Sequence, residues 1–471
     1  MDAHINTQAS LNQKEKPHGY ISSSNLVILA LAAAFFPRVL MMLKIPSAIN
    51  FLHFVVVPLA WVVAMATTRT RDVKQLALAR SIVTALWILL LVEFASAILN
   101  EAGWINAVLH FLLFSEPFML IVAIICIPTT EKRVEHLRFW ILGFGFVNLG
   151  FALIQKFVLK WDTCGCSPGG WGDGDAIKGV FISQGSGHVV GGSVSASLAV
   201  YYYVTATNRP LWMRIGVVFL TFIHIIVSDT KQVLSVCMVA FIFLALSNVK
   251  DIVKVILYLT GIGIFTAVFS WAVANFEFLA AYLTWARPEL YGPDGQVTEF
   301  KQFGIATILE HMHSPLNLWL GLGPGHTIDR LGGWMIRDYS DLLVPLGATQ
   351  TTIASETWTK VGASWLGNSS SMFSPFFGWA AIWGDLGFLG LGAFLYLWLL
   401  TWRFSDEMSR FQLLTVFVNG LIFTQMQEPG YMLYVAALVG LRWQELKRDK
   451  LLKQQSVCLA SQPTATLTIP Y

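Results

Sequence analysis

Residues 107–127 read AVLHFLLFSEPFMLIVAIICI, and this stretch decides the fold class. A helix needs about 20 mostly apolar residues to cross the hydrocarbon core of a bilayer. This stretch meets that length, and Glu116 is its only acidic residue. It therefore predicts a membrane-spanning helix.

Comparable apolar stretches recur along the chain on both sides of this one. They lie at 21–43, 49–66, 81–99, 138–158, 183–206, 211–227, 232–247, 252–275, 377–402, 411–426 and 430–442. Together they predict an all-α polytopic membrane protein with about 12 transmembrane helices.

The composition agrees with this fold class and excludes others. Of the 471 residues, 55% are hydrophobic and 13% are charged, whereas a soluble protein carries about 25% charged residues. A soluble multidomain enzyme would lack the polar surface it needs. The net charge of +3 gives no indication of a nucleic-acid partner, and five cysteines are too few for a disulfide framework.

Lysine and arginine alternate between successive loops, which predicts the orientation. One set of loops carries thirteen basic residues: Arg69, Arg71, Lys74, Arg80, Lys132, Arg133, Arg138, Arg209, Arg214, Lys250, Lys254, Arg403 and Arg410. The intervening short loops carry four: Lys44, Lys160, Lys178 and Lys231. Because positive residues favour the cytoplasmic side, we expect both termini in the cytoplasm and the chain in the cytoplasmic (inner) membrane.

This orientation divides the chain into tails, helices and loops. We expect a cytoplasmic tail at 1–20, nine helices within 21–275, three helices within 377–443 and a second cytoplasmic tail at 444–471. Two outside loops, 159–182 and 276–376, are longer than ordinary connections. The second is rich in Trp, Gly and apolar runs, so we expect it to be a large, partly helical extracytoplasmic loop.

Three segments resemble the O-antigen ligase and O-antigen polymerase superfamily of integral-membrane glycosyltransferases. They are FISQGSGHVVGGSVSASLAVYYY at 181–203, SDTKQVLS at 228–235, and 300–391, which contains FKQFGIATILEHMHSPLNLWLGLGPGHT and NSSSMFSPFFGWAAIWGDLGFLGL. Lysines stand at 231 and 301 where that family usually has arginines. The His-Asn pair typical of ligases is absent before the last loop helix, which favours the polymerase side of the resemblance.

The resemblance implies a glycosyltransferase that acts outside the membrane without nucleotide, metal or other cofactor. Its donor is a polyprenyl-diphosphate-linked oligosaccharide, and its acceptor is a glycan. A flippase and a chain-length regulator are further partners that such a pathway implies. The site must then provide cationic groups for the leaving diphosphate, a base for the acceptor hydroxyl, and a lateral opening to the lipid bilayer.

Five basic residues on or near the outer side are candidates for diphosphate binding: Lys231, Lys301, Arg330, Arg337 and Arg38. Arg38 follows Pro37 inside the first apolar stretch, where a charge costs about 2.5–3.5 kcal/mol on insertion scales. Each also has a structural interpretation. Lys231 could pair with Asp229, Arg38 could reach the interface beside Lys44, and the others could be solvated loop charges.

The candidate catalytic residues are His326 and Glu310. His326 follows Gly321-Leu322-Gly323-Pro324-Gly325, a turn whose N–H groups could face an anion, and Glu310 ends the preceding amphipathic segment. A structural or capping histidine is the alternative. Glu310, His311 and His313 lack a further spaced ligand, so we predict no metal site there.

Two alternatives to a polymerase remain at this level. One is an O-antigen ligase, which would transfer finished glycan to a lipid or protein acceptor. The other is a transporter of a lipid-linked or anionic solute. A transporter is expected to carry charged residues in mid-span and an internal repeat; we find no repeat and few such charges in the sequence.

Overall fold

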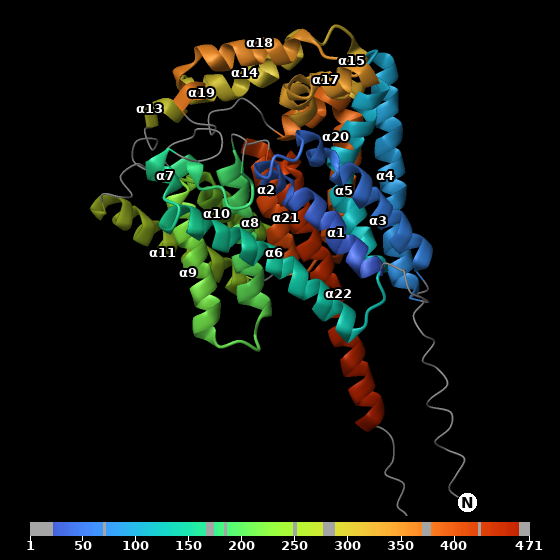
Figure 1. The fold of residues 1–471 in the computed structure, drawn as a ribbon, viewed down its shortest axis with the longest axis vertical. Coiled ribbons are helices and arrows are strands. Elements are labelled where there is room, and N and C mark those ends of the chain that lie inside the picture. The colour runs from blue at the N-terminus through green and yellow to red at the C-terminus, as the bar shows by residue number, and fades with distance from the viewer. Residues whose placement is uncertain are drawn as a thin grey trace, which may run out of the picture.

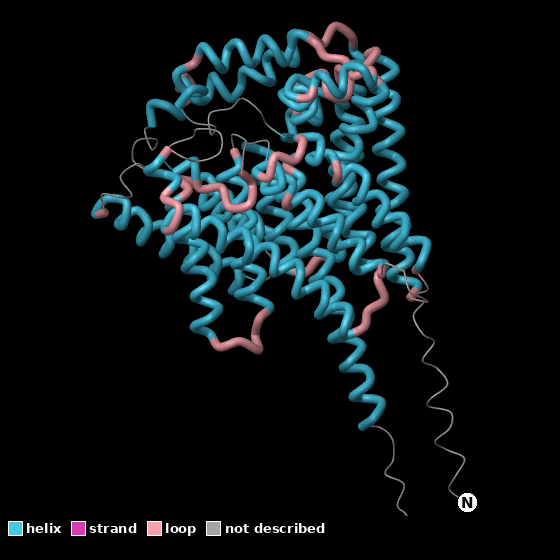
Figure 2. The backbone as a smooth tube through the Cα atoms, viewed as in Figure 1, coloured by secondary structure: helices cyan, strands magenta, loops and turns pink. Residues whose placement is uncertain are grey.

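The computed structural model describes residues 22–68, 72–165, 174–182, 186–247, 252–276, 288–369, 378–422 and 425–460. These residues form helices and connecting loops, and no strand occurs among them (Figure 2). The predicted tail at 1–20 and parts of both outside loops, including 166–173, 277–287 and 370–377, lie outside the described residues.

The helices up to residue 275 follow the apolar stretches of the sequence. They are α1 (Ser23–Phe35), α2 (Pro37–Met42), η1 (Ser47–Phe51), α3 (His53–Thr67), α4 (Val73–Leu99), α5 (Trp104–Cys126), α6 (Glu131–Phe157), α7 (Trp161–Cys164), η2 (Gly174–Ala176), α8 (Gly187–Thr205), α9 (Leu211–Val227), α10 (Lys231–Ser247) and α11 (Ile252–Asn275).

Short helices fill the long loop, and three longer ones follow it. They are α13 (Pro288–Tyr291), α14 (Gln296–Glu310), α15 (Pro315–Leu320), η4 (Leu331–Met335), α16 (Ile336–Asp338), α17 (Ser340–Leu343), η5 (Val344–Leu346), α18 (Thr352–Ala363), α19 (Trp365–Ser369), α20 (Gly378–Phe404), α21 (Glu407–Ile422), η7 (Gln425–Gln427) and α22 (Pro429–Ala460).

Six of the described helical segments are long and apolar enough to cross a bilayer. They are η1 with α3, and α4, α5, α6, α11 and α20. The helices α1, α9 and α10 are apolar but shorter. The chain is thus all-α in its described part and has the composition of a membrane-embedded protein, while the count of twelve spans stays a prediction.

Two of these helices show how differently an apolar sequence is covered. In α5 every residue from Leu113 to Cys126 is buried, because α3, α4 and α22 pack around it. In α11 the most apolar window has no buried residue, and side chains such as Val253 are largely exposed. An exposed apolar helix of this length fits lipid as its surroundings.

The two ends of the helix bundle differ in chemistry. The helices α13 to α19 form a layer at one end, and the C-terminal part of α22 extends from the other (Figure 1). Ion pairs join α22 to its neighbours: Lys447 with Asp72 at 2.8 Å, Arg442 with Asp406 at 2.7 Å, and Arg138 with Glu445. A further pair, Lys254 with Glu407 at 2.6 Å, joins α11 to α21. Of the thirteen loop basic residues, Arg138 and Lys254 take part in these ion pairs.

A glycine turn attaches the loop layer to the bundle. Gly321 has a φ of +73°, and a Cβ there would lie 2.2 Å from the carbonyl of Asp385. The following amides of Leu322 and Gly323 donate to the carbonyls of Gly384 and Asp385 at 2.8 and 3.0 Å. Only glycine permits both this backbone conformation and this approach, so residues 321–330 are held directly against α20.

Candidate functional site

Two of the nominated cations, Arg38 and Arg330, meet in one narrow crevice although 291 residues of sequence separate them. The crevice lies between the first helices and the loop layer, and its free space is about 20 Å³. Its walls are formed by Arg38, Asn50, Phe51, His53, Phe54, Arg330, Trp334, Met335 and Tyr339. No other candidate cation from the sequence lines it.

A break in the first apolar stretch positions Arg38. The sequence predicts one helix over 21–43, whereas the structure divides it at Phe36 into α1 and α2. Pro37 lacks an N–H and begins α2. The Nη1 atom of Arg38 is buried and makes no hydrogen bond within the described residues, while the guanidinium is attracted by Glu428 and repelled by Arg330.

Arg330 is fixed from the opposite wall by the segment between α21 and α22. Its guanidinium forms an ion pair with Glu428, and its backbone N–H donates to Gln427 Oε1 at 2.6 Å. The guanidinium also lies 5.7 Å from the ring centre of Trp334. These contacts hold the side chain in place before any ligand arrives.

A buried histidine–carboxylate pair completes the crevice. His53 Nδ1 lies 2.7 Å from Glu116 Oε2, and both side chains are nearly inaccessible. Because Glu116 occupies Nδ1, the Nε2 atom is the ring nitrogen available to a molecule in the crevice. A carboxylate that orients an imidazole in this way is a common arrangement for a general base. Across the crevice, Asn50 Nδ2 donates to Tyr339 Oη at 2.8 Å.

Sequence reasoning noted Glu116 but missed its partner. Glu116 stands out in the sequence as the only acidic residue of the apolar stretch 107–127, and its contact with His53 on α3 supplies the second half of the pair. The available signal was a histidine in the first turn of a strongly apolar helix. The pairing itself could not be read from the sequence, since 63 positions separate the two residues.

The remaining nominated cations lie elsewhere. Lys231 begins α10 and pairs with Asp229 at 3.0 Å. Arg337 is half exposed, pairs with Asp338 at 2.9 Å and lies 4.9 Å from the Trp358 ring centre.

Lys301 and Glu310 both belong to α14 in the loop layer. Burial lowers the pKa of Lys301 to about 7, while Glu310 is exposed at the C-terminal end of the helix.

His326, nominated as a base, has both ring nitrogens engaged by the protein. Nδ1 lies 3.0 Å from the carbonyl oxygen of Leu322, and Nε2 lies 2.7 Å from Thr349 Oγ1. Burial lowers the pKa of His326, which favours the neutral ring. In this arrangement the ring closes the glycine turn, and neither nitrogen is free for a substrate.

A second polar cluster lies behind the glycine turn. Glu93, His110, Asp329 and Asp385 come from α4, α5, the loop and α20, and all four side chains are fully buried. Burial, and then the Asp385 carboxylate, raise the pKa of Asp329 to about 7. Among the described residues, His110, Asp329 and Asp385 form the group of side chains that could hold a metal ion.

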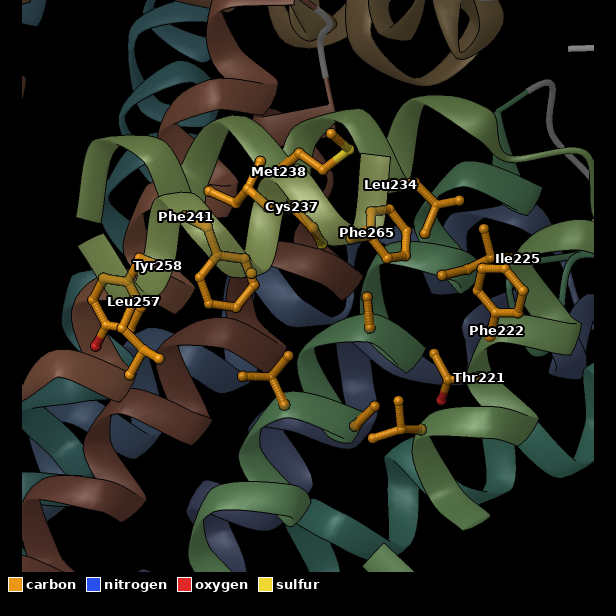
Figure 3. A pocket seen from close by; sticks show the side chains of 16 residues that line it. Thr221, Phe222, Ile225, Leu234, Cys237, Met238, Phe241, Leu257, Tyr258 and Phe265 are labelled. Carbon is orange, nitrogen blue, oxygen red and sulfur yellow. The ribbon is translucent and has the colours of Figure 1, made fainter. Parts of the chain in front are cut away.

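An apolar cavity of about 390 Å³ lies between α8, α9, α10 and α11 (Figure 3). The side chains of Phe222, Phe241 and Phe265 surround it, together with aliphatic residues and the thiol of Cys237. Among the described residues that line it, Thr221 and Tyr258 carry polar side chains. No residue lines both this cavity and the crevice.

No protein-family model matches the chain, and no curated protein matches it. What the protein does must therefore be inferred from the chemistry of these three regions.

Proposed function

We propose that the protein is a membrane glycosyltransferase of the O-antigen polymerase type. It would extend a surface polysaccharide by joining a glycan from a polyprenyl-diphosphate carrier to an acceptor glycan at the outer face of the cytoplasmic membrane. The observation that carries this proposal is the meeting of Arg38 and Arg330 beside the His53–Glu116 pair.

The two guanidinium groups that face the crevice favour an anionic ligand. Glu428 attracts both, Asp338 also attracts Arg38, and the Glu116 carboxylate is engaged by His53. A diphosphate would displace Glu428 and give each arginine an oxygen pair that matches its planar fork. Such contacts strengthen as negative charge develops on the leaving group, which is what transition-state stabilisation requires.

His53 would act as the base. The acceptor hydroxyl gives its proton to Nε2, its oxygen bonds to the anomeric carbon of the donor, and the bond from that carbon to the diphosphate oxygen breaks. The electron pair leaves with the diphosphate, held by Arg38 and Arg330. Glu116 stabilises the imidazolium that forms, through the 2.7 Å contact to Nδ1.

The location of the crevice supports an outer-face reaction. It lies on the side of the loop layer, away from the end where α22 pairs with Asp72 and Asp406. If the positive-inside rule places that end of α22 in the cytoplasm, the crevice would face outside.

A diphosphate is larger than the present crevice, so binding requires it to open. The Asn50–Tyr339 hydrogen bond joins the wall formed by the first helices to the wall formed by the loop layer. Separation of these two residues would admit the diphosphate from the outer side. The apolar cavity offers room for part of a polyprenyl chain within the bilayer.

The structure also contains an observation that favours a second candidate, a transporter. Glu93, His110 and Asp385 are ionisable groups buried within helices of membrane-spanning length, and such groups mark ion or proton pathways in transporters. A ligase remains the alternative within the enzyme class, because it would use the same donor and differ in its acceptor.

The test uses purified full-length protein in detergent with a lipid-linked repeat unit. We expect chain growth with the wild type and with Arg337→Ala, which removes an exposed arginine of the same loop. We expect none with Arg38→Ala or Arg330→Ala, each checked for an unchanged unfolding temperature. Full chain growth in both variants would refute the assignment. Failure of the wild type, with solute movement in vesicles, would favour the transporter.

A ligase is separated from a polymerase by glycan analysis of a deletion strain. Loss of a polymerase leaves single-repeat glycans, whereas loss of a ligase leaves accumulated lipid-linked polymer. The proposal predicts the first result.

A further inference from the structure

The cluster of Glu93, His110, Asp329 and Asp385 has too few hydrogen-bond donors for its acceptors. His110 Nδ1 lies 2.7 Å from Glu93 Oε1, and His110 Nε2 faces Asp385 Oδ2 at 3.2 Å and Asp329 Oδ2 at 3.5 Å. A single proton on Nε2 cannot serve both oxygens. Asp329 Oδ2 is fully buried, points into the cluster and has no hydrogen-bond partner in the described structure.

Burial makes this shortage costly. Three carboxyl groups and one imidazole share a site with no solvent access, and buried charges are normally paired or bound to a metal. Even a protonated His110 would leave an excess of negative charge while the three carboxyls are ionised. A cation at the centre would compensate that charge.

Each of the three inward-facing residues is oriented by a bond through its other polar atom. Asp385 Oδ1 accepts the backbone N–H of Thr327 at 2.9 Å, and Asp329 Oδ1 accepts that of Gly332 at 2.6 Å. His110 is oriented by Glu93. Metal-binding histidines and carboxylates are typically held in this way by a second hydrogen bond.

The spacing of the three residues fits a small tetrahedral ion. One possible ligand atom from each of His110, Asp329 and Asp385 lies within 4.8 Å of the other two. Bonds of about 2.1 Å to a tetrahedral zinc ion place neighbouring ligands about 3.4 Å apart, close to the 3.2 and 3.5 Å found here. One imidazole nitrogen with two carboxylate oxygens suits Zn²⁺, and Mn²⁺ is the next choice.

We propose that His110, Asp329 and Asp385 bind one divalent cation, Zn²⁺ in the first instance, with Glu93 as a positioning residue. The cation ties the loop segment at 327–332 to α5 and α20. Because Arg330 follows Asp329, the same cation fixes one wall of the crevice. The sequence indicated no metal, and the site goes beyond the proposed glycosyl transfer, which does not require it.

The experiment measures metal binding by the full-length protein in detergent. Protein is dialysed against a chelator, titrated with zinc chloride, and followed by calorimetry, metal analysis and thermal unfolding. We expect one equivalent of zinc per chain and a higher unfolding temperature with zinc than without. Asp329→Asn should lose both effects, whereas Asp338→Asn, which changes an exposed aspartate nearby, should keep them.

A second variant keeps the test decisive if Asp329→Asn does not fold. Glu93→Gln retains all three ligands but alters the residue that orients His110, so zinc affinity should fall by about 10–100-fold. Manganese chloride is titrated in parallel and should bind with lower affinity.

Two results would overturn the proposal. One is a wild type that binds no stoichiometric zinc or manganese. The other is an Asp329→Asn variant that binds zinc as the wild type does. If Asp329→Asn is also more stable than the chelated wild type, the cluster is a hydrogen-bonded proton network. None of these measurements depends on glycosyl transfer, so failure of either proposal is recognised separately.

Discussion

The crevice and the apolar cavity are opposites in both size and chemistry. The crevice has two guanidinium groups and a histidine–carboxylate pair around about 20 Å³ of space, while the cavity offers about 390 Å³ with two polar side chains. Charged groups bind a ligand only at particular distances and orientations. Apolar walls stabilise a bound ligand in proportion to the apolar area that is buried, whatever its orientation. The difference suggests that the crevice binds a charged head group and that the cavity binds a hydrocarbon chain.

The largest fall in the rate of chain growth should follow substitution of His53, the proposed base. His53→Gln keeps a polar side chain of similar size but removes the basic nitrogen, so chain growth should fall by about 10²–10⁴-fold. Single-turnover rates with saturating lipid-linked donor measure this loss. His313→Gln, a substitution of a histidine outside the crevice, serves as the control. A His53→Gln rate within a few-fold of the wild type would remove the crevice from the chemistry.

The next effect tests the geometry of the charge. Arg330→Lys retains the positive charge but loses the planar fork that can bind two oxygens. Loss of one charge-assisted hydrogen bond, about 1.5–3 kcal/mol, predicts about a 10–150-fold fall in kcat/KM. Arg337→Lys should leave kcat/KM unchanged. An equal kcat/KM in the two variants would mean that the positive charge of Arg330, and not the geometry of its guanidinium group, supports the reaction.

A smaller effect is expected in the apolar cavity. Gly261 lines the cavity on α11, and a side chain there would meet open space. Gly261→Leu should fill part of the volume and raise KM for long-chain donors about tenfold, since each displaced methylene is worth about 0.8 kcal/mol.

Gly263→Leu is the matched control, because Gly263 lies on the same helix but does not line the cavity. Donors with a short isoprenoid chain should show no change in either variant. An equal rise in KM for short and long chains in Gly261→Leu would show that the cavity does not hold the tail.

The smallest effect concerns pH and the turn that supports the crevice. The pKa of His326 is lower in the folded protein than in the unfolded chain because the ring is buried. Between those two pKa values the unfolded chain binds more protons, so stability should rise with pH and level off above about 6.5. His326→Gln should flatten this rise, measured by thermal unfolding between pH 4 and pH 8. An unchanged slope would contradict the assignment of this proton to His326.

Some of these features were readable from the sequence and others were not. The all-α class followed from long apolar stretches such as 107–127, and Arg38 was recognisable because a charge in such a stretch is costly. The His53–Glu116 pair and the cluster around His110 bring together residues from separate helices and the long loop. Tertiary packing brings these residues together, so the spacing of residues along the sequence does not predict either cluster.

Lys231 and Lys301 illustrate the reverse case. Both stand where the family resemblance places functional arginines, yet neither lines the crevice in the structure. A resemblance to a family matches residues by their order along the chain. Whether the matched residues meet at one site depends on how α10 and α14 pack in the structure. Their role in diphosphate binding stays a prediction that substitution by alanine can test.

The most direct test of the central claim is the affinity of purified protein for a polyprenyl diphosphate compared with the uncharged polyprenol of the same chain length. We predict that the wild type binds the diphosphate at least about tenfold more tightly, which corresponds to about 1.4 kcal/mol. This preference should disappear in a variant that combines Arg38→Ala with Arg330→Ala, while its polyprenol affinity is unchanged. An undiminished preference in that variant would contradict the assignment of the crevice to the diphosphate.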